Sequence, residues 1–322
     1  MPRLFGTNGI RGVVNEDMNV QLASNLGMAI GTYLSGGRVA IGTDTRTSNE
    51  MMKSAVISGL LSCGSRIVDL CIVPTPVLQY HVKHSETQHG VVITASHNPP
   101  RFNGIKCIDG DGTELSREKE EKLEDIYFSK AFRKVPWDRI GVIKREGNAI
   151  EHYIKGVIRH IDVNAVSKAQ LKVVLDCGNG AGSLVSPVLL ERIGCKVVTL
   201  NAHPRGTFPG HESEPTPENL KDLLKATLNF GADIGIAHDG DSDRTIFIDE
   251  KGNYLYGDRI LALVAREMLR ESNGGLIVTT VASSLAMGDV TRDNNGKIIF
   301  TKVGSPIVAR KMMETKALFG GE

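Results

Sequence analysis

Cysteine and aromatic residues are scarce in this sequence. It contains one tryptophan, 5% aromatic residues, and five cysteines that form no C-x-x-C pair. An odd number of cysteines without that spacing makes neither a disulfide framework nor a zinc knuckle, and indicates a reducing compartment, the cytoplasm. Long apolar runs are missing as well. No stretch approaches the roughly 18 apolar residues of a membrane span, and the N-terminus lacks the apolar segment of a secretion signal.

An excess of charge of one sign is also absent. Lys and Arg number 38 against 37 Asp and Glu, a net charge of +1. This balance argues against nucleic acid or an anionic membrane as the main partner. Glycine, by contrast, is abundant: 35 of 322 residues, about 11% against a usual ~7%. The glycines form no periodic tract, so we expect them in tight turns. The length predicts two or three domains.

Short Val- and Ile-rich runs alternate with helical patterns along the whole chain. We predict strands at 38–42, 67–72, 90–95, 172–176, 196–200, 232–237 and 276–280, and helices at 51–63, 75–82, 114–130, 182–193, 219–229 and 259–270. Thr47 to Glu50 is typical of a capping box before the first of these helices. The alternation starts again twice, which predicts an α/β protein of tandem related domains with mixed, largely parallel sheets. We expect domains at 1–150, 151–253 and 254–322.

Ser96 lies in the first segment that indicates a catalytic or ligand-binding role, Thr94-Ala95-Ser96-His97-Asn98-Pro99-Pro100. A predicted strand delivers this serine to its carboxyl end, where open α/β sheets bind ligands. No G-x-S-x-G surrounds it, as a hydrolase nucleophile would require. The side chain of His97, the next residue, is expected to point away from Ser96, so a Ser–His dyad is not expected. Either the segment is a turn with a hydroxyl bonded to its own backbone, or Ser96 carries a transferable group such as phosphate.

A second segment, Asp239-Gly240-Asp241-Ser242-Asp243-Arg244, also follows a predicted strand. Its three carboxylates at alternate positions can turn to one side of a loop, and oxygen donors without Cys or His favour Mg²⁺. Arg244 is suited to a bidentate grip on phosphate. An EF-hand needs glycine where Arg244 stands, and an aspartyl-phosphatase motif would not have Asp243 at its fifth position. A solvated acidic turn is the remaining alternative.

Several glycine-rich segments are less specific. Gly6 to Gly12, with Arg11, and Asn103 to Lys106 could each bring backbone N–H groups and one cation close to a phosphate, or be plain loops. Glycines 178, 180 and 182 do not match the G-x-G-x-x-G spacing of a dinucleotide site, and we interpret them as a tight turn between strand and helix.

Together these segments resemble the α-D-phosphohexomutase family of phosphoglucomutases, phosphomannomutases and phosphoglucosamine mutases. Gly6 to Gly12 is similar to the N-terminal substrate loop, Thr94 to Pro100 to the phosphoserine loop, and Asp239 to Arg244 to the metal loop. Asn103 to Lys106 is similar to the segment with the lysine that follows, and Thr301-Lys302-Val303-Gly304 to a third-domain segment. Pro100 and that last segment look most like archaeal members.

The resemblance implies an isomerase that interconverts hexose 1-phosphate and 6-phosphate through a hexose bisphosphate. Ser96 would carry a phosphoryl group and, with Asp239, Asp241 and Asp243, bind Mg²⁺. Lys106 and Arg11 would polarise the phosphoryl group and assist proton transfer, and His97 is counted among the catalytic residues. Arg244, Gly304, Ser305 and Glu322 would bind the substrate. A hexose phosphate is the expected partner, with neither nucleic acid nor membrane, and a homodimer is a possible assembly.

The end of the chain departs from the family pattern. Phe319 to Glu322 coincides with the start of the sugar-binding loop, and the family's fourth domain, with its phosphate-clamping S-G-T motif, is expected to be missing. Ser305 stands where other members have His, and Asn8 replaces a common Ser. Two alternatives therefore remain open: a sugar-phosphate-binding fragment without turnover, and a Mg²⁺-dependent sugar phosphatase with Asp239 as nucleophile.

Overall fold

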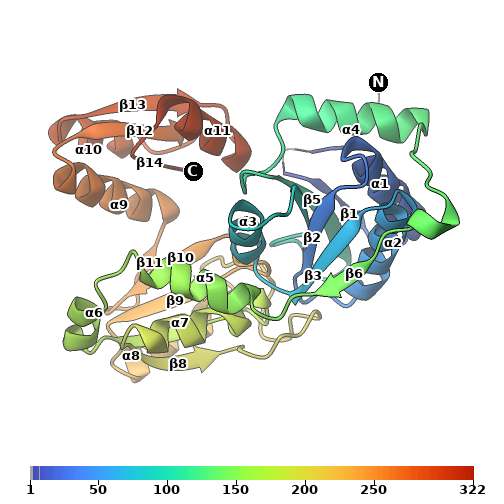
Figure 1. The fold of residues 1–322 in the computed structure, drawn as a ribbon. Helices are drawn as coiled ribbons and strands as arrows, with labels where there is room; N and C mark the ends of the chain where they lie inside the picture. Colours follow the sequence, from blue (N-terminus) through green and yellow to red (C-terminus); the bar gives the residue numbers. More distant parts are fainter. Residues whose placement is uncertain (1–2, 7) are drawn as a thin grey trace. The chain divides into compact units, whose positions relative to one another are not determined.

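The chain divides into two compact units in a computed structural model that describes residues 3–6 and 8–322 (Figure 1). The first unit extends to Gly112 and resumes from Glu118 to Tyr254. The second comprises Thr113–Arg117 and Leu255–Glu322. Thr7, within the predicted substrate loop, lies outside the described residues. In the described part of the chain, no helix combines the length and the apolar composition that crossing a membrane requires.

The first unit contains a mixed six-stranded sheet in the order β1-β5-β4-β2-β3-β6. Parallel pairing joins β2 to β3 and β4, and β3 to β6, whereas β5 runs antiparallel to β1 and β4. β2 is buried on both faces, and its Ala40 packs in a core with Val77 and Leu78 of α3. The strands are β1 (Ile10–Val13), β2 (Arg38–Thr43), β3 (Arg66–Ile72), β4 (His89–Ile93), β5 (Phe102–Asp109) and β6 (Ile143–Arg145).

Helices cover this sheet, and two of them, α1 and α2, pack tightly on each other. Gly27 and Gly59 make this approach possible: a Cβ on either would lie 2.2 Å from a backbone oxygen of the other helix. The helices around the first sheet are α1 (Val20–Tyr33), α2 (Asn49–Ser62), α3 (Thr75–Lys83), α4 (Arg117–Ser129), α5 (Ala149–Ile158) and a 3-10 turn, η1 (Trp137–Arg139).

A second sheet in the same unit has the order β11-β10-β9-β7-β8. β7 pairs parallel with β8 and β9, and β10 returns antiparallel to β9. Val174, Leu223 and Ala237 belong to its buried core. The elements are α6 (Val163–Ala169), β7 (Lys172–Asp176), η2 (Ala181–Leu184), α7 (Ser186–Arg192), β8 (Lys196–Leu200), α8 (Lys221–Asn229), β9 (Ile234–His238), β10 (Thr245–Asp249) and β11 (Tyr254–Leu255).

The second unit is built on a three-stranded parallel sheet in the order β13-β12-β14. Leu269 of α9, Ile277 of β12 and Met287 of α10 are buried together in its core. The elements are α9 (Gly257–Glu271), β12 (Gly275–Thr280), α10 (Ala286–Asp293), β13 (Gly296–Thr301), α11 (Ser305–Thr315) and β14 (Phe319–Gly321).

The predicted class, tandem α/β domains with mixed and largely parallel sheets, is confirmed, but two local predictions are wrong. The capping box predicted at Thr47 to Glu50 does not form: the N-cap of α2 is Ser48, which makes no side-chain cap, and its hydroxyl accepts a hydrogen bond from Asn103 Nδ2 (2.8 Å). The predicted helix at 182–193 is interrupted at Val185 (φ −124°), and α7 begins beyond it with Pro187 in its first turn. A proline there needs no N–H partner, so it starts a helix well and continues one badly.

Candidate active site

Ser96 lies just beyond the carboxyl end of β4, and its side chain points at the second sheet's acidic loop. Its backbone is in the left-handed region (φ +50°), and the residue is 1% exposed. Its N–H donates to Thr94 Oγ1 (2.8 Å), and its Oγ donates to Asp239 Oδ2 (2.6 Å). The hydroxyl is thus bonded to a carboxylate 143 positions further along the chain and not only to its own turn.

We expected from the sequence that His97 points away from Ser96, and this is wrong: its Nδ1 lies 3.4 Å from Ser96 Oγ. The expectation assumed the alternation of an extended strand, and the left-handed φ at Ser96 abolishes that alternation. The His97 ring also lies 3.5 Å from Glu214 Oε2. Burial, and then the nearby Arg244 charge, lower the pKa of His97, although Glu214 opposes them.

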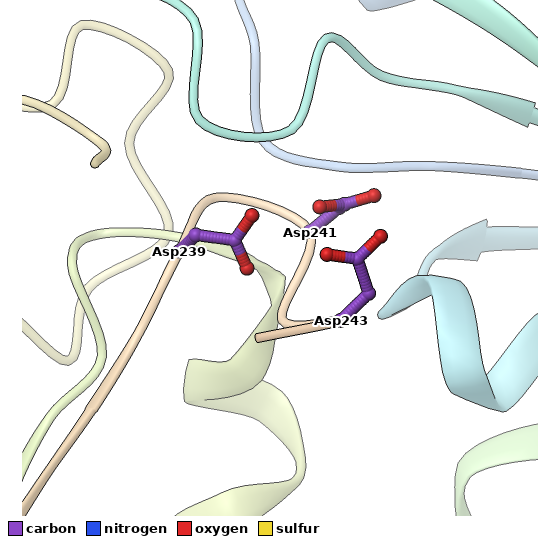
Figure 2. A group of neighbouring side chains, drawn as sticks. All are labelled: Asp239, Asp241 and Asp243. Atoms are coloured by element: carbon purple, nitrogen blue, oxygen red, sulfur yellow. The ribbon is translucent and has the colours of Figure 1, made fainter. Parts of the chain in front are cut away.

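The three aspartates on the loop after β9 gather their carboxylates at one point (Figure 2). One oxygen from each lies within 4.8 Å of the others. Asp239 and Asp241 are fully buried, whereas a quarter of the Asp243 side chain is exposed. Burial and the neighbouring charges of Asp241 and Asp243 raise the pKa of Asp239 well above its usual value. Burial also acts to raise the pKa of Asp241, but Lys106 and Thr75 outweigh it and lower that pKa to about 2.

Lys106, on β5, is the buried cation among these carboxylates. It is 1% exposed, and its Nζ lies 2.9 Å from Asp241 Oδ2 and 2.7 Å from Asp243 Oδ2. Thr75, the first residue of α3, donates its hydroxyl to the same Asp241 oxygen (2.6 Å). The structure therefore brings together elements of both sheets: the Ser96 loop, β5, the start of α3 and the loop after β9.

Arg11 reaches this region from β1, where it pairs with Gly104 of β5. A Cβ at Gly104 would lie 2.6 Å from the Ile10 and Thr94 oxygens and 2.9 Å from Arg11 Cγ, so the strands fit here because position 104 is glycine. The charge of Arg11 contributes to the lowered pKa of Asp241. Its Nε is buried and has no hydrogen-bond partner within the described residues.

The donor set fits a hard divalent cation. Three carboxylates converge without Cys or His, which favours Mg²⁺ over Zn²⁺. Asp241 Oδ1 is buried and lacks a hydrogen-bond partner among residues 3–6 and 8–322. A buried oxygen of that kind is costly unless a cation or water satisfies it. Burial, and then the negative charges of Asp241 and Asp243, raise the pKa of Asp239, and a bound cation would offset both effects.

Arg244, predicted to bind phosphate, is paired in this structure. Its NH1 lies 2.9 Å from Glu214 Oε1 and 3.2 Å from Oε2. Sequence reasoning missed Glu214 and Thr75, as well as Arg46, which contacts the Ser96 backbone. Thr75 and Arg46 follow β3 and β2 closely. Thr75 and Arg46 could have been predicted from the sequence as polar residues just beyond neighbouring parallel strands, because the carboxyl ends of such strands share one edge of the sheet.

Gly304, Ser305 and Glu322 belong to the second unit. Gly304 precedes α11 with φ +137°, a conformation that glycine adopts readily, and its N–H donates to Glu322 Oε2 (2.7 Å). Ser305 and Glu322 are both exposed within that unit. The structure thus joins two of these predicted substrate-binding residues directly to each other.

Tandem α/β/α domains with a serine facing three carboxylates define the class of the phosphohexomutases. The chain matches the phosphoglucomutase/phosphomannomutase models for α/β/α domain I over residues 2–134, domain II over 151–252 and domain III over 256–322. The chain belongs to this family, and is an isomerase of the phosphohexomutase type. The family, fold class and enzyme class predicted from the sequence are thereby confirmed.

Archaeal proteins are among its similar relatives. A phosphoglucomutase/phosphomannomutase of Thermococcus kodakarensis is 47% identical over all of this chain and 72% of its own length. A protein of Pyrococcus abyssi described as "Probable phosphoglucosamine mutase" is 45% identical over all of this chain and 70% of its own. The crystal structure of a phosphoglucomutase/phosphomannomutase family protein from Burkholderia thailandensis superposes with a TM-score of 0.89 at 28% identity, over 99% of this chain and 70% of that one.

Proposed function

We propose that the protein interconverts a hexose 1-phosphate and a hexose 6-phosphate, with Ser96 as the residue that carries the phosphoryl group. One observation supports this most directly: Ser96 Oγ, almost wholly buried, donates to Asp239 Oδ2 at 2.6 Å, at the edge of a cluster of three carboxylates. A phosphoserine needs a nearby cation to offset its negative charge, and the three carboxylates would hold that cation beside Ser96.

In this proposal Asp239, Asp241 and Asp243, together with the phosphoserine, would hold Mg²⁺. When bound, Mg²⁺ supplies positive charge that offsets the charge developing on the transferred phosphoryl group. Lys106 is fixed between Asp241 and Asp243, so its ammonium keeps a constant position next to the group. Arg11 adds a second cation from β1. The near-complete burial of Ser96 excludes water, which limits loss of the phosphoryl group to hydrolysis.

The reaction then has two balanced transfers. The free hydroxyl of a hexose phosphate attacks the phosphorus of phosphoserine and gives its proton to a base in the site. The P–O bond to Ser96 Oγ breaks, and this oxygen takes up a proton to become a serine hydroxyl again. The resulting hexose bisphosphate reverses its orientation and returns its other phosphate to Ser96. Lys106, Arg11 and His97 are the proposed partners of these protons and phosphoryl oxygens. His97 supports this because its Nδ1 is 3.4 Å from Ser96 Oγ.

Substrate recognition is assigned to Arg244, Gly304, Ser305 and Glu322. The exposed Arg244 guanidinium would exchange Glu214 for a substrate phosphate, and the carboxylate of Glu322 would accept hydrogen bonds from sugar hydroxyls. We assign these roles to domains at 1–150, 151–253 and 254–322. A glucose, mannose or glucosamine phosphate would each satisfy this chemistry, with the hexose bisphosphate as activator.

Ser96→Ala tests the proposal. Intact mass should find one phosphoryl group on the wild type and none on the variant, and isomer exchange should fall at least about 10⁴-fold, the scale of losing a catalytic nucleophile. Ser58→Ala is the control, since it removes an exposed hydroxyl that donates to Ala55 O within α2. Turnover that survives in Ser96→Ala would overturn the proposal. Release of inorganic phosphate without isomer exchange would identify a phosphatase instead, and phosphoserine without turnover a binding fragment.

A further inference from the structure

A buried arginine, Arg46, binds the backbone of the whole Ser96 loop. It lies three residues beyond β2 and is 2% exposed. Its NH2 donates to the carbonyl oxygens of Ser96 (2.8 Å) and Asn98 (2.6 Å), and its NH1 donates to those of Pro99 (2.8 Å) and Phe102 (2.9 Å). One guanidinium therefore fixes the loop from the serine itself to the first residue of β5.

Asp44 in turn fixes this guanidinium. Its carboxylate lies 3.1 Å from Arg46 Nε and accepts from Arg46 N, from Asn49 Nδ2 and from Thr94 Oγ1 (2.7 Å). Thr94 Oγ1 also accepts from Ser96 N (2.8 Å). Both backbone groups of Ser96 thus lead to the same pair of charges: the carbonyl directly to Arg46, and the N–H through Thr94 to Asp44.

This arrangement matters because Ser96 has a left-handed backbone (φ +50°), which non-glycine residues keep only when their surroundings impose it. The direction of Ser96 Oγ depends on that backbone, and in this conformation Oγ lies 2.6 Å from Asp239 Oδ2. A planar fork of five N–H donors can reach several carbonyls and a carboxylate together, whereas a lysine ammonium has three donors around one atom.

We propose that Arg46, with Asp44 and Thr94, is a positioning group for the phosphoryl-carrying serine: it holds the Ser96 backbone so that Oγ faces the metal-binding carboxylates. The assignment rests on the proposed role of Ser96 as phosphoryl carrier. None of the three side chains is assigned a contact with the transferred group. They act through the Ser96 backbone.

Arg46→Lys is the test, because it keeps the charge and removes the fork. Arg66→Lys is the matched control, an exposed arginine on the neighbouring strand β3. Amide exchange of the segment 94–102, followed by mass spectrometry, should accelerate at least about tenfold in Arg46→Lys and stay unchanged in the control. The phosphorylation rate of Ser96 by a hexose bisphosphate and kcat should both fall by about 100-fold, the effect of a misplacement of about 1 Å, with KM nearly constant.

A second pair of variants keeps the proposal testable if Arg46→Lys does not fold. Thr94→Val removes the hydroxyl between Ser96 N and Asp44, and Thr94→Ser restores it. Slow phosphorylation in Thr94→Val with recovery in Thr94→Ser supports the positioning role. Wild-type exchange and phosphorylation rates in folded Arg46→Lys or in Thr94→Val would overturn it. A wild-type protein that never acquires phosphoserine would instead refute the proposed function, and the exchange result would remain separately interpretable.

Discussion

The proposed chemistry and the proposed substrate recognition differ in burial. In the first unit Ser96, Lys106, Asp239 and Asp241 are each at most 1% exposed and joined by hydrogen bonds and ion pairs from several strands and loops. In the second unit Ser305 and Glu322 are exposed, and one hydrogen bond links Gly304 to Glu322. The residues of the first site are buried and bonded to one another, whereas those of the second are exposed at the start of α11 and just after β14.

This difference in burial predicts how much free energy of unfolding each substitution costs. Buried charges are stable only as a set, so removing one leaves others unpaired at high cost. Exposed groups are solvated whether or not they are paired, and their loss is small. We therefore expect substitutions to lose effect on folding in the order of increasing exposure, from Lys106 through His211 and Glu214 to Glu322.

Lys106→Met should have the largest effect on stability. The change leaves Asp241 buried beside Asp239 and Asp243 without its ammonium, and breaking a buried pair costs about 3–5 kcal/mol of unfolding free energy. Urea unfolding in the presence of a chelator measures this loss. Saturating Mg²⁺ should restore part of it, about 2.7 kcal/mol at 100 times the dissociation constant, because the cation binds only the folded state.

Lys122→Met is the control for this prediction. Lys122 pairs with Glu118 (2.7 Å) on the solvent-exposed side of α4, where both side chains are more than half accessible. Its loss should leave the urea midpoint almost unchanged. Equal effects of the two lysine substitutions would contradict the contrast between the buried cluster and the exposed surface.

The sequence predicted the residues at this site better than the contacts between them. Asp239, Asp241 and Asp243 were recognisable because like charges at alternate positions need a cation. The pairing of Lys106 with two of them depends on β5, which we did not predict since Asn103 and Lys106 interrupt its apolar pattern. Burial on the inner part of the sheet overrides that polarity, and hydrogen bonds to Ser48 and Asp241 compensate it.

Arg46 and His97 mark a second limit. The four carbonyls that Arg46 binds belong to a loop some 50 residues further along the chain, and no local pattern indicates such a contact. The position of His97 depends on one backbone angle, the φ of Ser96, which short-range propensities do not specify. Strand alternation was readable because its period is local, whereas these contacts are set by tertiary packing.

His211 should give a smaller effect, visible as pH dependence. It lies 3.3 Å from the buried Asp176. Burial acts to lower its pKa, but Asp176 outweighs burial and the pKa of His211 is raised. A raised pKa stabilises the folded state fully below the unfolded value of about 6.5, and this stabilisation is lost as pH rises through the folded pKa. The free energy of unfolding should therefore decrease above pH 6.5 or so.

His211→Asn should flatten this decrease, and the exposed His160→Asn should not. The comparison is clean because other histidines with shifted pKa values are lowered and titrate at more acidic pH: His81, His89, His97 and His238. Chemical denaturation at closely spaced pH values is the measurement. A slope that persists in His211→Asn would assign the dependence to other groups.

Glu214→Gln should affect substrate binding more than folding. The pair with Arg244 is partly exposed, at 36% and 46%, so its removal should change the unfolding free energy by only about 0–1 kcal/mol. Arg244 is then free to bind a substrate phosphate, and KM for a hexose phosphate should fall by about threefold, roughly 0.6 kcal/mol. Steady-state kinetics measure it. A higher KM would mean that Glu214 holds Arg244 in its binding position.

Glu322→Gln should have the smallest effect on folding and act on sugar discrimination alone. The amide oxygen can still accept from Gly304 N, so stability should stay within about 0.5 kcal/mol. A hydrogen bond from a sugar hydroxyl to a carboxylate exceeds one to a neutral amide by about 1 kcal/mol, so kcat/KM should fall about fivefold for the preferred hexose phosphate. Glu314→Gln is the control, an exposed carboxylate on α11 that pairs with Lys311. If both variants lower kcat/KM alike, the effect comes from the net charge of the second unit. A loss that is confined to Glu322→Gln and differs among glucose, mannose and glucosamine phosphates would show that the Glu322 carboxylate contributes to sugar specificity.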